Sequence, residues 1–312
     1  MKNRYFFNRK ILWRYVSEKV EEFDPDIIHL NKNIIAPVAV LKGLEGRRVV
    51  KTVHDFGYVS LEDKYAYEMN DFERKLRKTL DKGTQRYLKK LRSQVIDEYT
   101  APSKALTKEL RKNDYKPATH LPNFVTDRES SPGGGHFLFV GRLEDGKAPD
   151  LLMEAYSEEM PPLEIAGKGK MKEKLEKESP ENVTVHGYVS EEKLEELYLG
   201  AKAVIIPSRW RENNPLVALE AKAHGSALIV SNSGGLPELV EEKETGFIFE
   251  SEKVEELRDK LSKNVDWEKL GVNSKKDFEE KYRPEAYTKI LSESLRILNQ
   301  VLYIRMFSVL LI

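Results

Sequence analysis

The sequence predicts an α/β fold in which two domains each contain a parallel, doubly wound sheet. Short apolar runs with the length of buried strands alternate with helix-length segments along the chain, and this alternation favours parallel sheets. A segment rich in serine, proline and glycine, residues 128–135, separates two series of such runs. The length of 312 residues also corresponds to about two compact domains.

The first series of elements predicts an N-terminal domain over residues 1–132. Apolar periodicity distinguishes its helices from its strands. His29 lies in the middle of an apolar run, which indicates a buried core histidine. The expected elements are a helix over Phe7–Phe23, strands over Asp26–Leu30 and Arg48–His54, a basic helix over Asn70–Arg92 and a strand over Gln94–Thr100.

The second series predicts a C-terminal domain over residues 133–283. Its short apolar runs are spaced by helix-length segments, and ligands of such sheets bind beyond the carboxyl ends of the strands. Apolar residues at helical spacing then predict a long terminal helix over residues 284–312, packing back toward the N-terminal domain. The expected strands are His136–Gly141, Leu163–Gly167, Asn182–Gly187, Lys202–Pro207, Ala227–Ser231 and Gly246–Phe249.

The composition narrows the class of protein. Basic and acidic residues balance at 52 each, so we expect no nucleic-acid partner. The 40% of hydrophobic residues is sufficient for packed cores. Cysteine is absent, which excludes disulfides and thiolate metal sites and fits a reducing compartment. We therefore expect a globular, cytoplasmic protein.

The two ends of the chain bear on membrane contact. Residues 1–10 are basic and aromatic without the pattern of a cleavable signal peptide. Residues 297–312 are mostly apolar but fall short of the roughly 20 residues of a membrane span, so we expect a packed or interfacial helix there. Together with the basic helix they suit a peripheral contact with an anionic membrane on its cytoplasmic face. Solvated charge and an ordinary packing helix are the alternative.

A first candidate site lies at the end of the strand that begins at His136. Gly141 to Lys147 places Arg142, Lys147 and two glycines between this strand and a helix expected near Pro149. An arginine fork, a lysine ammonium and the amides of a helix start all suit a diphosphate. The alternative is an ordinary charged turn.

A second candidate site contains two glutamates. Glu212 precedes Asn213 and Asn214, and Pro215 suits the first position of a helix that carries Glu220 about two turns on. Both carboxylates suit a ligand rich in hydroxyls, such as a ribose or another sugar. In a chain rich in glutamate this spacing also arises without function.

Four further residues are candidates for ligand contact. Gly234 and Gly235 follow a strand and allow close backbone approach, as Gly167 does with a weaker signal. A tight turn explains the same glycines without a ligand. His54 ends a strand of the first domain, where an imidazole can donate to a sugar or phosphate oxygen. No cluster with metal-ligand spacing is present.

These motifs follow one another in a defined order. The second domain has Phe139–Leu143 with Lys147, Pro207–Ser208, Glu212, Glu220–Ala221, Gly225, Gly234–Glu238 and Thr245–Gly246. In order and spacing they resemble the family 4 glycosyltransferases of the GT-B fold. Earlier segments resemble the later half of that family's first domain; they are Pro25–His29, His54–Asp55, Ala101–Ser103 and Leu121–Asn123.

The resemblance implies two facing Rossmann-like domains and a hexosyltransferase-type activity. The donor substrate implied is a nucleotide-diphosphate sugar, and no metal or other cofactor is expected. The sugar passes to a glycan, a lipid-linked acceptor or another conjugate with retention of anomeric configuration.

The resemblance also implies residue roles. The expected catalytic residues are His54, Arg142, Lys147 and Glu212: the two cations hold the diphosphate, while Glu212 and His54 contact the donor sugar. Glu220 binds the ribose. The remaining expected donor contacts are Gly141, Gly167, Tyr188, Val189, Asn213, Asn214, Leu216, Gly234 and Gly235, with Tyr188 and Val189 beside the base.

The sequence departs from the family pattern in two places. Family members often have Phe-Gly where this chain has Asn214-Pro215, and Pro215 has no amide hydrogen to donate. The strand, glycine-rich loop and helix that normally open the first domain have no counterpart, so the N-terminal domain is expected to be incomplete. A nucleotide-sugar-binding protein without transfer activity is therefore the alternative function, and a GT-B epimerase or phosphorylase is a third.

Overall fold

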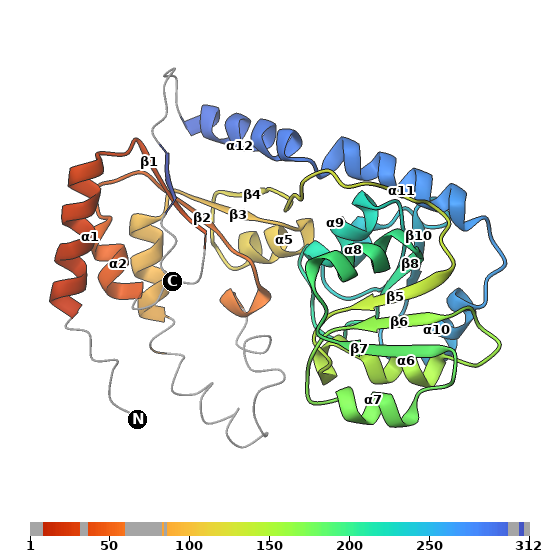
Figure 1. Cartoon of the computed structure of the whole chain (residues 1–312). Coiled ribbons are helices and arrows are strands. Elements are labelled where there is room, and N and C mark those ends of the chain that lie inside the picture. Colours follow the sequence, from red (N-terminus) through yellow and green to blue (C-terminus); the bar gives the residue numbers. More distant parts are fainter. Residues whose placement is uncertain (1–8, 32–36, 60–82, 84–85, 299–305, 309–312) are drawn as a thin grey trace. The chain divides into compact units, whose positions relative to one another are not determined.

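The computed structural model describes residues 9–31, 37–59, 83, 86–298 and 306–308. They belong to two compact units, Met1–Leu121 with Ser292–Ile312 and Pro122–Leu291, and Figure 1 labels most of their helices and strands. The sequence placed the boundary at residue 132. The segment that follows residue 121 is bonded to the second unit, because the Val125 amide donates to the Tyr282 carbonyl (3.3 Å) and the Ser131 amide to the His224 carbonyl (3.0 Å).

The sheet of the N-terminal unit has five strands in the order β11-β1-β2-β3-β4. Every neighbouring pair is parallel, as the alternating pattern predicts. The strands are β1 (Ile27–Leu30), β2 (Val49–Thr52), β3 (Glu98–Ala101), β4 (Ala118–His120) and β11 (Met306–Ser308).

Helices pack against this sheet and close a single core. Ser103 caps α5 by accepting a hydrogen bond from the Leu106 amide (3.1 Å). The core joins strand residues such as Ile28 and Val49 to helix residues such as Leu41 and Leu106. The helices are α1 (Arg9–Phe23), α2 (Pro37–Gly43), the 3₁₀ turn η1 (Phe56–Tyr58), a helical segment over residues 86–95 and α5 (Lys104–Lys112).

The junction before β3 differs from the prediction. We expected a basic helix to end at Arg92 and a strand to begin at Gln94. The helix instead continues to residue 95, where the Ile96 amide donates to the Arg92 carbonyl (2.8 Å), and Leu91 and Val95 enter the core. Apolar contacts on one helical face thus override the strand propensity of Val95. Residues 70–82 of the expected helix lie outside the described residues.

The end of the chain also differs from the prediction. We expected a packed or interfacial helix over residues 297–312, but residues 306–308 form β11. This strand pairs in parallel with β1, with Ile27 beside Met306 and His29 beside Ser308. The outer edge of β1 otherwise presents unpaired amides and carbonyls, and an extended segment satisfies them where a helix does not.

The sheet of the C-terminal unit confirms the six expected strands to within one residue at each end. Its order is β10-β9-β8-β5-β6-β7, and all neighbouring pairs are parallel. The strands are β5 (His136–Val140), β6 (Leu163–Ala166), β7 (Val183–Gly187), β8 (Ala201–Ile206), β9 (Ala227–Ser231) and β10 (Gly246–Phe249).

This second sheet is buried on both faces, as a doubly wound fold requires. Phe137 and Phe139 of β5 belong to one core, whereas Leu138 between them belongs to another. Helices α6, α7 and α10 contribute to the first core and α8 and α9 to the second. The helices are α6 (Pro149–Ala155), α7 (Lys172–Glu178), α8 (Glu191–Leu199), α9 (Leu216–Ala223), α10 (Val254–Leu261) and α11 (Trp267–Lys281), with 3₁₀ turns η2 (Asp145–Lys147) and η3 (Leu236–Leu239).

The long C-terminal helix expected after residue 284 is α12 (Pro284–Leu298). Neither it nor any other helix among the described residues combines the length and the apolar character needed to cross a bilayer.

Candidate functional site

The residues predicted for the C-terminal unit gather at one edge of its sheet. Because all six strands run parallel, their carboxyl ends lie along the same edge, where ligands of such folds bind. The predicted residues follow these ends in turn: Gly141–Lys147 after β5, Gly167 after β6, Tyr188 after β7, Glu212 after β8 and Gly234 after β9.

Glycines bring the ends of β5, β6 and β7 into close contact. The Gly167 amide donates to the Gly187 carbonyl (2.7 Å), and the Gly141 amide donates to the carbonyl of Ala166 (3.0 Å). A Cβ atom on Gly167 would lie 1.8 Å from the Gly141 carbonyl oxygen, and Gly167 has φ +151°. The backbone of Gly141 therefore leaves no room for a side chain at Gly167, which explains the glycine at 167 through strand packing before any ligand is considered.

Lys147 and Glu212 form the centre of the site. The Lys147 ammonium lies 2.5 Å from Glu212 Oε1, and the Ser208 hydroxyl donates to the same oxygen (2.7 Å). Their side chains are only 22% and 12% exposed, so this ion pair is shielded more than a surface pair. The structure thus brings together a cation and a carboxylate that the sequence placed in separate motifs.

Lys147 is positioned by the turn before α6. Ala148 adopts a left-handed conformation (φ 53°), and Pro149 then starts the helix, where its fixed φ is favourable. The turn is fastened to the loop after β8 because the Arg209 amide donates to the Gly146 carbonyl (3.0 Å). The expected helix start near Pro149 is confirmed.

Arg142 is more exposed than Lys147. Its guanidinium lies 2.7 Å from Glu144, and the two side chains are 54% and 34% exposed. The same guanidinium lies 4.7 Å from the centroid of the Trp210 ring. Sequence reasoning missed Trp210, because its contacts join loops that are far apart along the chain.

Gly234 and Gly235 hold the backbone of Glu212. The Gly235 amide donates to the Glu212 carbonyl (2.7 Å). Gly234 has φ +64°, and a Cβ atom there would lie 2.1 Å from the same carbonyl oxygen. The neighbouring loop thus approaches these glycines closely, and at Gly234 only glycine permits this approach; their predicted contact with a ligand stays a prediction.

Glu220 lies on α9 with one carboxylate oxygen engaged. The Tyr198 hydroxyl, from α8, donates to Glu220 Oε2 (2.9 Å). Burial raises the pKa of Tyr198 well above its usual value, and Glu220 adds to this, so the phenol remains a donor. The Tyr198 ring stacks on His224 at 4.9 Å. No motif in the sequence pointed to Tyr198 or His224.

The segment before α9 differs from its prediction in one respect. Pro215 was expected at the first helical position, but it is the N-cap of α9, with ψ 134°. This ψ is that of extended backbone, whereas a residue in the first turn of a helix has a ψ of about −40°. Asn213 and Asn214 are buried. The Asn214 side-chain oxygen accepts from the Asn123 amide (3.0 Å), so this side chain already has a structural role, while Leu216 is 49% exposed.

Tyr188 and Val189 follow β7. The Tyr188 ring is 79% exposed, and the Lys168 ammonium lies 5.2 Å from its centroid. Val189 packs beside the core that contains α8 and α9. An exposed ring with a cation nearby suits stacking against a planar group.

His54 belongs to the N-terminal unit, at the carboxyl end of β2. Its Nε2 lies 2.7 Å from the Asn31 side-chain oxygen, which follows β1. The side chain reaches solvent, but partial burial, followed by the charge of Lys51, lowers the pKa of the imidazole. His54 is therefore neutral at physiological pH, with Nε2–H donating to the Asn31 oxygen and Nδ1 as the acceptor nitrogen.

Lys51 is a buried cation that sequence reasoning missed. It is 1% exposed, and its ammonium donates to the carbonyls of Thr52 (2.7 Å) and Leu30 (3.3 Å). Burial lowers its pKa to about 8. His29 is a core histidine, as expected, with Nε2 2.7 Å from the Thr52 hydroxyl, and burial lowers its pKa to about 4.

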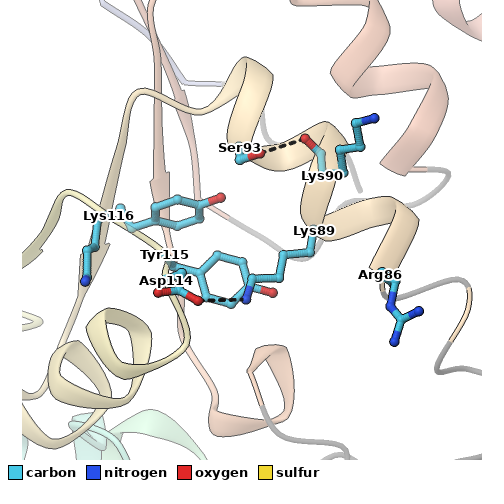
Figure 2. A pocket seen from close by; sticks show the side chains of 8 residues that line it. Arg86, Lys89, Lys90, Ser93, Asp114, Tyr115 and Lys116 are labelled. Atoms are coloured by element: carbon cyan, nitrogen blue, oxygen red, sulfur yellow. Dashed lines mark hydrogen bonds and ion pairs between the residues drawn. The ribbon is translucent and has the colours of Figure 1, made fainter.

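The N-terminal unit also has a cavity of about 340 Å³, which neither Lys51 nor His29 lines (Figure 2). Lys89 lies 3.5 Å from Asp114 in it. Figure 2 shows the tips of Arg86, Lys90 and Lys116 pointing in different directions, so they do not converge on one ligand position. Its lining residues are Arg86, Lys89, Lys90, Ser93, Tyr99, Asp114, Tyr115 and Lys116.

Within the parts of the chain that the structure describes, no group of three or more His, Asp or Glu side chains is arranged to hold a metal ion. The described site itself presents cations, carboxylates and hydroxyls, which suit a polar ligand.

Family comparisons cover most of the chain. Residues 127–283 match the family described as Glycosyl transferases group 1, and residues 2–129 match Glycosyltransferase Family 4. Both agree with the resemblance drawn from the motifs.

Two relatives are similar in sequence over part of their length. Spore coat protein SA of Bacillus subtilis is 31% identical over 166 residues, which is 46% of this chain and 44% of that protein. An uncharacterised glycosyltransferase of Methanocaldococcus jannaschii is 32% identical over 173 residues, or 51% of this chain and 43% of that protein. The chain thus matches less than half the length of either relative.

Solved structures match nearly the whole chain. Sucrose-phosphate synthase of Thermosynechococcus elongatus has a TM-score of 0.74 at 20% identity, covering 96% of this chain and 80% of that one. HepE of Anabaena, solved in complex with UDP, has a TM-score of 0.74 at 16% identity and covers 91% and 82%. HepE has also been solved with UDP-glucose. The likeness confirms the GT-B fold.

Proposed function

This chain belongs to the glycosyl transferases group 1 family, and from that membership we propose that it transfers a sugar from a nucleotide-diphosphate sugar to an acceptor with retention of anomeric configuration. The acceptor class proposed is a glycan, a lipid-linked saccharide or a related conjugate. The observation that carries the proposal is the shielded cluster of Lys147, Glu212 and Ser208 at the carboxyl edge of the sheet.

The diphosphate is proposed to bind at Lys147 and Arg142. In the ligand-free protein each cation contacts one carboxylate, Glu212 and Glu144 respectively. Phosphate oxygens are stronger partners for these cations because they carry more charge and accept several bonds. The bound cations then stabilise the negative charge that develops on the leaving diphosphate.

The nucleoside and the sugar are proposed to bind on either side of the diphosphate. Glu220 accepts from the ribose hydroxyls, with one of its oxygens fixed by Tyr198. Glu212 and the backbone at Asn213 orient the donor sugar once Lys147 turns toward the diphosphate. Tyr188 offers an exposed ring to the base.

In the proposed transfer, the bond between the anomeric carbon and the diphosphate oxygen breaks, and its electron pair stays on the diphosphate. The acceptor hydroxyl oxygen bonds to the same face of the anomeric carbon, and its proton passes to the departing phosphate oxygen. This step needs no protein nucleophile, so Glu212 and Glu220 are not a glycosidase pair. From the N-terminal unit, His54 is proposed to contact a sugar hydroxyl.

A screen of nucleotide sugars tests the proposal, with UDP-sugars first because HepE binds UDP and UDP-glucose. Binding is measured by calorimetry, and turnover by release of the nucleoside diphosphate with and without added acceptors and chelator. The variants are Lys147→Ala and Glu220→Ala. Matched controls are Lys177→Ala and Glu173→Ala, which alter exposed side chains of α7.

The outcomes separate the alternatives. Transfer that is lost in both site variants and kept in both controls supports the proposal. Donor binding without any release of nucleoside diphosphate identifies a binding protein, whereas conversion of the donor sugar without acceptor identifies an epimerase. Unchanged affinity and turnover in both site variants would show that the site is placed wrongly.

A further inference from the structure

Trp210 connects three loops of the candidate site. Gly146 packs on its indole so closely that a Cβ atom at 146 would lie 2.1 Å from Trp210 Cε2. The Trp210 amide donates to the Gly146 carbonyl (3.1 Å), and the Ser233 hydroxyl donates to the Trp210 carbonyl (2.7 Å). The loops that follow β5, β8 and β9 are thereby fixed to one residue.

The same ring lies beside both cations of the proposed diphosphate site. Arg142 Cζ is 4.7 Å from the ring centroid and Lys147 Nζ is 6.0 Å from it, distances at which the face of an indole attracts a cation. A tryptophan that only filled a core would not bring two cations together at the carboxyl edge of a sheet.

Each cation contacts a carboxylate as well as this ring. Arg142 pairs with Glu144 and Lys147 with Glu212. A diphosphate that replaces the carboxylates as partner leaves the ring contact unaffected, because an indole face does not compete for the phosphate oxygens. The ring can therefore keep the cations in place while their acidic partners change.

We propose that Trp210 is a positioning residue that holds Arg142 and Lys147 where the leaving diphosphate develops its charge. The inference rests on the proposed function, since it requires a diphosphate at these cations. Trp210 does not touch the reacting atoms. Its effect appears chiefly in the chemical step, because a misplacement of about 1 Å in a catalytic group costs up to about 100-fold in rate.

The kinetic test compares Trp210→Leu and Trp210→Phe. The leucine removes the ring, and we expect kcat to fall about 30-fold while KM for the donor changes less than about threefold. The phenylalanine retains a weaker cation–π contact, so we expect a smaller loss of about threefold to tenfold. Thermal melts of both variants measure whether the loops remain folded.

A spectroscopic test follows the ring itself. Titration of the full chain with UDP and with inorganic pyrophosphate is expected to change the tryptophan fluorescence, since the charge of the bound diphosphate changes the electric field at the Trp210 indole while the cations stay in place. Trp210→Phe should lose this signal while calorimetry still detects binding. Trp13→Phe is the matched control, because Trp13 is an exposed residue of the other unit, and it should keep the signal.

The results distinguish this inference from the proposed function. Two outcomes would overturn the positioning role alone, provided that the chain binds UDP. One is a wild-type kcat in both folded Trp210 variants. The other is the absence of a fluorescence change that depends on Trp210. Failure of the wild-type chain to bind either UDP or pyrophosphate would overturn the proposed function together with it. A kcat loss that phenylalanine partly restores, at nearly constant KM, supports the inference.

Discussion

The carboxyl edges of the two sheets hold their charged side chains in opposite ways. In the C-terminal unit the cations contact acids, as Lys147 does with Glu212 and Arg142 with Glu144. In the N-terminal unit the buried Lys51 donates to backbone carbonyls, and its pKa falls to about 8. The first arrangement offers each cation an anionic partner, and the second makes the charge of the lysine depend on pH.

This difference suggests a division of properties between the units. Cations that already contact carboxylates can exchange one anionic partner for another. A buried lysine and a buried histidine instead change protonation within the range of ordinary buffers. We therefore expect anion binding to depend on the C-terminal unit and the pH dependence of stability to depend strongly on the N-terminal unit.

The largest expected effect comes from Glu212→Gln, which removes the charge partner of Lys147. Turnover should fall about 100-fold, because the donor sugar loses the carboxylate that orients it. UDP should bind about threefold to tenfold more tightly, because Lys147 no longer has to give up its ion pair with Glu212 before it contacts the phosphate. Steady-state kinetics and calorimetry measure the two effects.

The control for Glu212→Gln is Glu176→Gln, which alters an exposed pair with Lys172; both quantities should stay at wild-type values. A fall in UDP affinity together with turnover in Glu212→Gln would mean that the pair supports the loop rather than exchanging partners. That result would contradict the proposed difference between the carboxyl edges of the two sheets.

The second largest effect is expected in the pH dependence of the free energy of unfolding, to which Lys51 contributes. Its folded pKa of about 8 lies below its unfolded value, so between pH 8 and 9.5 the unfolded chain binds more protons. Stability should therefore rise with pH there, by about 2 kcal/mol. Denaturant unfolding at several pH values should show this rise in the wild type and not in Lys51→Met.

His29 supplies the matching test at acid pH. Its folded pKa of about 4 is also depressed, so its contribution to stability is lost as pH falls from about 6.5 toward 4. His29→Gln should flatten that part of the unfolding profile while leaving the rise above pH 8. Identical profiles for both variants and the wild type would contradict the assignment of pH dependence to this unit.

The smallest effect is expected from Tyr198→Phe, which deletes the hydroxyl that donates to Glu220. KM for the donor should rise about fivefold with little change in kcat, since one hydrogen bond to a carboxylate is lost. The effect should be the same from pH 6 to 9, because the phenol pKa lies well above this range. Tyr156→Phe, whose hydroxyl donates to the Pro161 carbonyl, should leave KM unchanged.

The sequence predicted correctly those elements whose apolar residues alone mark their ends. The six strands of the C-terminal unit are short runs buried on both faces, so their apolar residues alone mark the ends to within a residue. The predicted boundary between helix and strand near Val95 was wrong, because an apolar valine fits the buried face of a helix as well as it fits a strand. The prediction of a helix over residues 297–312 was wrong at β11, because this strand is stabilised by pairing with β1, which lies far away in sequence.

The candidate site was predictable to a similar extent. Motif order placed Lys147, Glu212 and Glu220 at the same sheet edge, but it did not indicate that Lys147 and Glu212 are in contact. Tyr198 and Trp210 escaped prediction because their roles arise from contacts between distant elements. Gly234 was identified as a point of close approach, whereas its neighbour, the Glu212 carbonyl, was visible only in the structure.

The pairing of β1 with β11 has a consequence for synthesis on the ribosome. β1 is made before the other described strands, and its outer partner β11 lies beyond the entire C-terminal unit in sequence. At translation rates of about 5–20 residues per second the delay is on the order of tens of seconds. The later unit can thus complete its sheet before the earlier one, which reverses the usual vectorial order and leaves the edge of β1 for chaperones to shield meanwhile.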